Sequence, residues 1–167
     1  MKCQFLHSPW LRAAGACLVL FFAVCSVSFA QPAGGEPTSA NVDAELAKQL
    51  GADERGMRPY VLVILKTGPN RVPAGPERDE MFKGHFANMG RLAADKKLAL
   101  AGPLDGVDGW RGLFVFSVSD IDEARSLVAT DPVVIKGEMV AEFHKFYGSA
   151  GIMAVNDIHK KLGKKSP

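Results

Sequence analysis

Two segments of the chain carry apolar residues on both faces of a predicted strand. Residues 60–65 read YVLVIL and residues 112–118 read GLFVFSV, and both are rich in β-branched and aromatic residues. Successive side chains of a strand point to opposite faces of its sheet. Both strands must therefore be covered on both faces, which is typical of strands at the centre of a sheet.

Two further segments show the periodicity of amphipathic helices. In residues 77–97 the apolar positions fall on one broad stripe. In residues 121–128 the apolar positions again share one side, and Asp120 with Glu123 predicts a capping box at the start. Each helix therefore has one face that is expected to pack on the sheet.

Two shorter segments complete the predicted sheet. Residues 98–101 are apolar and are expected to end at Gly102 and Pro103, and residues 138–147 alternate well enough for a last strand. The order is then strand, helix, strand, strand, helix, strand. This order predicts an α+β fold, a ferredoxin-like βαββαβ sandwich with both helices on one face and the two doubly apolar strands at the centre.

The opposite face of the predicted sheet is also apolar, and the two helices of the domain do not cover it. Exposed apolar faces of this kind mark interaction surfaces, and the same face of a second copy would cover it economically. We therefore expect a homodimer that closes through the sheet face.

The first 30 residues have the pattern of an export signal. Basic residues come first, residues 13–29 are apolar without a charge, and Ser28-Phe29-Ala30 resembles a signal-peptidase site. Cleavage there predicts an exported protein, periplasmic or secreted, with no membrane attachment. A retained N-terminal anchor is the alternative, because the apolar run approaches the length of a short membrane span.

The rest of the chain is predicted to hold one domain between two accessory segments. Residues 31–58 are a flexible lead-in with a short helix, residues 59–148 are the domain, and residues 149–167 are a tail with a helix. All three cysteines of the chain lie within the export segment. The domain is therefore expected to rely on its core and its assembly rather than on disulfides.

Charge and motif content argue against several functional classes. Beyond the first 30 residues the chain carries 18 basic and 18 acidic residues, so no nucleic-acid partner is expected. His85, His144 and His159 lie on separate elements without a cysteine, so no metal site is expected. The sequence contains no phosphate loop and no dinucleotide-binding glycine motif, and we expect no cofactor.

Two residues of the domain are candidates for acid–base chemistry. His85 lies four residues from both Met81 and Met89 on the apolar stripe, so its imidazole is expected to face the sheet. It is either a proton-transfer group or a core histidine that a backbone carbonyl satisfies. Asp131 stands directly before Pro132, as a helix N-cap does, and capping does not prevent its carboxylate from orienting a histidine.

The domain resembles the YCII-related (YciI-like) family. The resemblance covers residues 60–148 and rests on HFANMGRLAADKKLALAGPLDG, GLFVFSVSDIDEARSLVATDP and GEMVAEFHKFYG, in this order. It implies a fold similar to the dimeric α+β barrels, which include muconolactone isomerase and several small monooxygenases. It also implies a pocket between helices and sheet, with His85 and Asp131 as the catalytic pair and the Gly102-Pro103 turn in its wall.

Trp110 and Arg111 are expected on the loop beside that turn and are candidates for substrate binding. At the mouth of a pocket, an exposed indole and a guanidinium would stack on and clamp a small anionic aromatic molecule. The alternative is a packed loop tip, in which the two side chains serve the fold alone.

Two functions remain open at this point. One is a cofactor-free lyase or isomerase in which His85 moves a proton on a small cyclic or aromatic substrate, and the family includes a dehydrochlorinase that acts on a chlorinated hydroxyhydroquinone. The other is a dimeric module that binds such a molecule without turnover. The enzyme requires His85 within reach of Asp131 and of an open cavity, whereas the binding module requires only the cavity.

Overall fold

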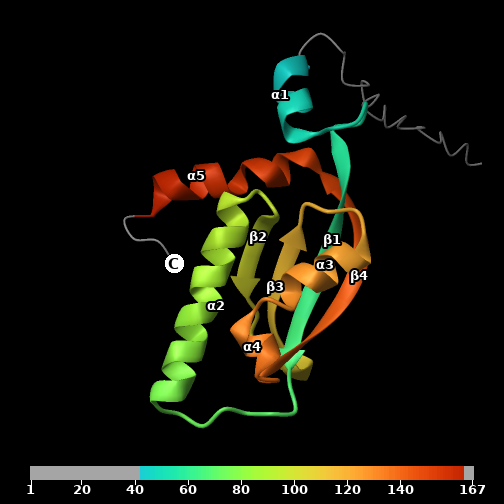
Figure 1. Ribbon diagram of the computed structural model, residues 1–167. Helices are drawn as coiled ribbons and strands as arrows, with labels where there is room; N and C mark the ends of the chain where they lie inside the picture. The colour runs from blue at the N-terminus through green and yellow to red at the C-terminus, as the bar shows by residue number, and fades with distance from the viewer. Residues whose placement is uncertain (1–41, 164–167) are drawn as a thin grey trace, which may run out of the picture. The chain divides into compact units, whose positions relative to one another are not determined.

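The sheet is built around the two strands that are apolar on both faces. The computed structural model describes residues 42–163, in which β1 (Met57–Thr67) and β3 (Trp110–Phe116) are the central strands of an antiparallel sheet. β2 (Leu98–Pro103) pairs with β3 at one edge, and β4 (Met139–Ser149) pairs with β1 at the other (Figure 1). The order β2-β3-β1-β4 is that of the predicted ferredoxin-like sandwich. The dimeric barrel stays a prediction.

Helices cover one face of this sheet. α2 (Pro76–Ala94), α3 (Ile121–Val128) and α4 (Pro132–Ile135) all lie on that side (Figure 1). Phe114 and Phe116 of β3 point toward these helices and belong to the main core. The core consists of Val61, Val63, Leu65, Met81, Leu92, Leu98, Phe114, Phe116, Val118, Ala124, Val128, Val133 and Met139.

The opposite face of the sheet carries a second, smaller apolar cluster. Tyr60, Ala99 and Val115 are buried in it, and Ile152 and Met153 of the short 3₁₀ segment η3 (Ala150–Ala154) pack against them. The C-terminal segment of the same chain thus covers part of the face that we expected a second copy to cover. The half-buried members of this cluster on the strands are Leu62, Leu100, Leu113 and Phe146.

Two features of the strands differ from the prediction. β2 does end at Gly102 and Pro103, but these two residues are its last two members rather than the first residues after it, and they lie opposite Leu113 and Gly112 of β3. Pro103 has no backbone N–H to donate. It is tolerated because β2 is an edge strand, whose outer side makes no hydrogen bonds to a further strand. In addition, a register irregularity in the β1–β3 pairing falls between Leu65 and Lys66, opposite the start of β3.

The helix ends also differ in detail. α2 ends at Ala94, three residues earlier than expected, because Lys96 adopts a left-handed φ of 55° that stops the helix. Asp120 caps α3 as predicted, but its side chain accepts from the Asp122 amide at 2.9 Å. The expected capping box does not form, because Glu123 instead lies 2.8 Å from Lys97.

The accessory helices fall close to their predicted positions. α1 (Ala44–Leu50) lies between Asp43, whose side chain caps its start, and Gly51, whose left-handed φ of 69° ends it. The C-terminal helix is α5 (Val155–Leu162), and its expected first turn forms η3 instead. The predicted export segment lies outside the described residues and stays a prediction.

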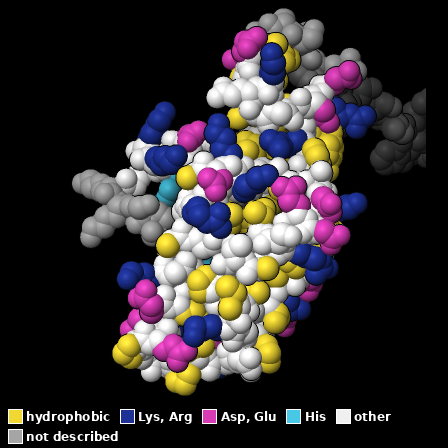
Figure 2. All heavy atoms as spheres, in the orientation of Figure 1, with side chains coloured by type: hydrophobic (Ala, Val, Ile, Leu, Met, Phe, Trp, Pro, Cys, Tyr) yellow, Lys and Arg dark blue, Asp and Glu magenta, His cyan; other side chains and the backbone are white. Residues whose placement is uncertain are grey.

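Opposite charges alternate over the helix-covered face, which Figure 2 shows with basic and acidic side chains interspersed. Lys136 on the turn after α4 lies 2.6 Å from Glu77 in the first turn of α2. No helix within residues 42–163 is both long enough and apolar enough to cross a membrane. In the same part of the chain, His, Cys, Asp and Glu do not gather in groups of three that would suit a metal ion.

Candidate active site

His85 and Asp131 meet in the structure. The imidazole Nδ1 lies 2.9 Å from Oδ1 and 2.8 Å from Oδ2 of the carboxylate, although the two residues are 46 positions apart in the sequence. His85 is 7% exposed and Asp131 is completely buried. A carboxylate that is withdrawn from water in this way needs a donor, and the imidazole supplies it.

Asp131 performs both of the roles that the sequence left open. As the N-cap of α4 it accepts a hydrogen bond from the Val133 amide to Oδ1 at 3.1 Å, and Pro132 occupies the first helical position. The same carboxylate accepts from His85. The helix cap therefore holds the carboxylate in one orientation, and the carboxylate in turn holds the imidazole.

The geometry assigns the tautomer of His85 by hydrogen-bond chemistry. An ionised carboxylate can only accept, so the proton of a neutral imidazole belongs on Nδ1 and the lone pair on Nε2. The ring is stacked on Phe114 with a centroid separation of 6.1 Å and lies 5.3 Å from the Phe86 ring. The His85 side chain as a whole is 9% exposed, whereas that of Asp131 is 1% exposed.

Gly84 allows the two elements of the pair to approach each other. A Cβ built at Gly84 would lie 3.0 Å from Cγ of Pro132, which is tighter than an ordinary van der Waals contact. These two residues are the sequence neighbours of His85 and Asp131. Sequence analysis did not identify Gly84 as important. The one local hint is that a glycine, a poor helix former, stands inside a predicted helix.

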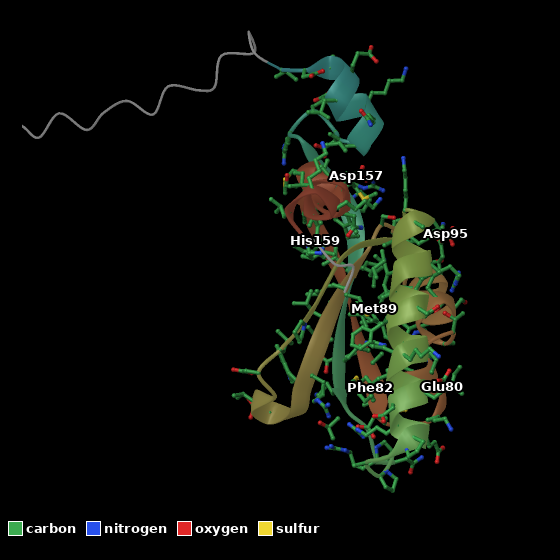
Figure 3. The ribbon with its side chains drawn as sticks, turned by 90° about the vertical axis from the view of Figure 1, so that its left-hand side faces the viewer. Glu80, Phe82, Met89, Asp95, Asp157 and His159 are labelled. Atoms are coloured by element: carbon green, nitrogen blue, oxygen red, sulfur yellow. The ribbon has the colours of Figure 1, made fainter. Side chains whose placement is uncertain are left out.

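A pocket of about 480 Å³ opens between α2, β2 and α5. Its walls are mostly apolar, and α5 contributes the polar side chains of Asn156, His159 and Lys160. Figure 3 shows Met89 on the side of α2 that faces the sheet, with Glu80 on the opposite side and His159 below α5. Asn156 anchors this end, because its Nδ2 donates to the Leu98 carbonyl of β2 at 2.8 Å.

His85 stands beside this pocket rather than in its wall. Phe86, the next residue, is half-exposed and lines the pocket, as does Met89 one helical turn further along α2. The Phe86 ring also contacts the imidazole. Phe86 is therefore the residue that both lines the pocket and contacts the imidazole.

The other predicted pocket residues lie elsewhere. Gly102, Pro103, Trp110 and Arg111 are absent from the described wall of the 480 Å³ pocket, which begins at the other end of β2. Trp110 is exposed. Arg111 instead reaches toward Glu138, with Nη1 3.9 Å from Oε1.

Glu138 is a buried charged residue that sequence reasoning missed, because its position suggested an ordinary polar residue of an alternating strand. It is completely buried directly before β4, and its Oε2 accepts from the Val72 amide at 2.7 Å. Burial raises the pKa of this carboxyl, but the Arg78 guanidinium, the Val72 amide and Arg71 together hold that pKa below its ordinary value. These partners of Glu138 come from other segments of the chain, so no local sequence pattern predicts the contacts.

Comparison with known proteins gives a family and related solved structures. The model of the YCII-related domain matches residues 59–146, a range that includes His85 and Asp131. Among curated proteins, none matches this chain. A solved structure of 5-chloro-2-hydroxyhydroquinone dehydrochlorinase (TftG) from Burkholderia phenoliruptrix AC1100, in complex with 2,5-dihydroxybenzoquinone, is 20% identical with a TM-score of 0.38. That comparison covers 52% of this chain and 92% of the other.

Proposed function

The chain belongs to the YCII-related domain family, and on that premise we propose that it is a cofactor-free lyase or isomerase acting on a small cyclic or aromatic substrate. The observation that carries the proposal is the buried His85–Asp131 pair, with Nδ1 2.8 Å from Oδ2, beside an apolar pocket. A histidine whose second nitrogen is fixed by a carboxylate is the usual arrangement of a general base.

The proposed chemistry uses Nε2 of His85. This atom takes a proton from a carbon of the substrate, and the electron pair of the broken C–H bond forms a new double bond. In a lyase the leaving group departs with its own electron pair. In an isomerase, His85 returns the proton at another position. The Asp131 carboxylate accepts from Nδ1 throughout and stabilises the imidazolium that forms, without itself becoming protonated.

The pocket supports a substrate of one ring. A volume of about 480 Å³ is within the range of small-molecule sites, and most of its wall is apolar. Phe86 separates the pocket from the imidazole, so the substrate ring is expected to displace or stack on the Phe86 ring when it reaches Nε2. This step makes Phe86 the residue whose rotamer controls access.

Proton exchange tests the proposal before the substrate is identified. Cyclic ketones and hydroxylated aromatic compounds, incubated with the protein in deuterated water, are expected to exchange an acidic C–H proton, which proton NMR detects. His85→Asn should abolish exchange and leave the fold intact. Asp131→Asn should reduce exchange and keep most of the stability, since Asn caps a helix nearly as well as Asp.

Asp131→Ala is the matched comparison. It removes the cap and the carboxylate together, and should cost about 1 kcal/mol more stability than Asp131→Asn. If Asp131→Asn exchanges protons as fast as the parent while Asp131→Ala is merely less stable, Asp131 is a cap and the catalytic pair is refuted.

A binding module without turnover is the second candidate, and one observation favours it. His85 is not among the residues that line the pocket, so a ligand can fill it without touching the imidazole. In that case His85→Asn would bind the compounds as the parent does, and neither protein would exchange protons.

A further inference from the structure

Three arginines converge on a single carboxylate oxygen at the end of the sheet away from α5. Oε1 of Glu138 lies 2.8 Å from Arg78 Nη2, 3.3 Å from Arg71 Nε and 3.9 Å from Arg111 Nη1. One guanidinium is enough to neutralise one carboxylate. The cluster therefore holds two positive charges in excess of its own anion.

The three arginines differ in how far the fold already uses them. The Arg78 guanidinium already makes contacts within the fold, because its Nη1 donates to the Val72 carbonyl at 2.8 Å and its Cζ lies over the Phe82 ring, 4.9 Å from the ring centroid. Its side chain is 20% exposed. Arg111 is 26% exposed, and within residues 42–163 its guanidinium donates no hydrogen bond. Arg71 is 59% exposed.

The shared carboxylate is also incompletely satisfied. Oε2 of Glu138 accepts from the Val72 amide, whereas the completely buried Oε1 has no aligned hydrogen-bond donor among the described residues. Arg78 approaches Oε1 as an ion pair without the direction of a hydrogen bond. Arg71 and Arg111 thus keep most of their donors, and guanidinium donors in this fork geometry match a planar carboxylate.

The cluster is connected to the candidate active site by one aromatic ring. Phe82 lies under Arg78 on one side and contacts His85 edge-on at a centroid distance of 6.1 Å on the other. Phe82 therefore links the arginine cluster to the imidazole through two direct contacts.

We propose that Arg71 and Arg111, supported by Arg78 on Glu138, form a binding site for the carboxylate of a small cyclic or aromatic acid. The assignment of this acid as the substrate of His85 rests on the proposed function, whereas the anion site itself does not. Glu138 holds the cluster together, and Arg111 supplies the unused donors.

The test is a titration of ¹⁵N-labelled protein, followed by NMR at the arginine Nε–H signals. The probes are benzoate, its neutral analogue benzamide, and inorganic phosphate. Benzoate should shift the Arg71 and Arg111 signals saturably, and benzamide should not. Arg111→Gln should weaken benzoate binding at least about tenfold, because a charge-assisted bidentate contact is lost. Arg71→Gln should weaken it less, because Arg71 is more exposed.

Arg55→Gln is the control, since it removes an exposed arginine that precedes β1 at the far end of that strand. It should bind benzoate as the parent does. The anion site is overturned if Arg111→Gln and Arg71→Gln, both still folded by their amide spectra, bind benzoate like Arg55→Gln. The carboxylate assignment is overturned if benzamide binds equally well or if only phosphate binds.

A separate comparison distinguishes this site from the proposed enzyme. His85→Asn should bind benzoate normally, because His85 does not contact the arginines. Loss of benzoate binding in Arg111→Gln without any proton exchange in the parent would support the anion site and refute the enzyme. Unchanged exchange of a cyclic acid in Arg111→Gln would refute the substrate-anchoring role and leave the enzyme standing.

Discussion

The approach of α2 to α4 at Gly84 leads to a quantitative prediction. In Gly84→Ala the new methyl group would lie 3.0 Å from Cγ of Pro132, so the two elements must separate by a few tenths of an ångström to reach an ordinary contact. His85 and Asp131 adjoin these residues, and their hydrogen bond of 2.8 Å would lengthen to roughly 3.2 Å, near the end of the useful range.

Two opposing energies decide the stability of Gly84→Ala. Alanine in a helix interior is better than glycine by about 1 kcal/mol, whereas overpacking costs about 1–3 kcal/mol. The net effect is a loss of about 0–2 kcal/mol in the free energy of unfolding. The misplaced imidazole should lower the rate of proton exchange by roughly tenfold to a hundredfold.

Gly90→Ala is the matched control in the same helix. A Cβ at Gly90 meets nothing within 4 Å, so this variant should gain about 0.5–1 kcal/mol from helix propensity alone. Denaturant unfolding measures the stabilities, and ¹⁵N NMR of the imidazole reports the Nδ1–H hydrogen bond. If Gly84→Ala is stabilised like Gly90→Ala and its imidazole signals are unchanged, the close approach does not set the geometry of the pair.

Two further predictions concern the sheet and the buried carboxylate. Leu113→Glu places a charge on the outward face of β3 and should raise the dissociation constant of the expected homodimer by at least about a hundredfold. Ile135→Glu, on the helix side, is the control and should leave that constant unchanged. Light scattering at micromolar concentration measures both variants. If the parent is monomeric at that concentration, the dimer is refuted. Glu138 has a lowered pKa, so its contribution to stability is complete above the pKa of the unfolded chain and is lost as the pH falls through the folded value. Glu138→Gln should therefore be less stable at neutral pH and lose less stability than the parent as the pH falls below the ordinary carboxyl pKa of 4.5. An equal acid dependence would contradict the assigned ion pairs.

The strands and their order could be predicted because each depends on a local pattern. Residues that are apolar on both faces identify β1 and β3 as central, and the helical stripe identifies the face of α2 that carries His85. The strand expected over residues 98–101 ends at Gly102-Pro103 as predicted, but it includes these two residues, because an edge strand accepts a proline.

The site was less predictable because its contacts join distant segments. Burial of His85 followed from its spacing, but its partner came from the family resemblance, since no local pattern relates residues 46 positions apart. Glu138 shows the same limit more clearly. Its sequence position suggests a strand residue, and only the fold brings Arg71, Arg78 and Arg111 to it.

The hydrogen bond from Asn156 to the Leu98 carbonyl has a consequence for aggregation. β2 is an edge strand, and the unpaired backbone groups along its outer side are a template on which a strand of another molecule can add. Asn156 occupies one of these groups and brings α5 across the start of the strand. The C-terminal helix therefore hinders strand addition at this edge, and a chain shortened before residue 155 would leave the Leu98 carbonyl free to pair with a strand of another molecule.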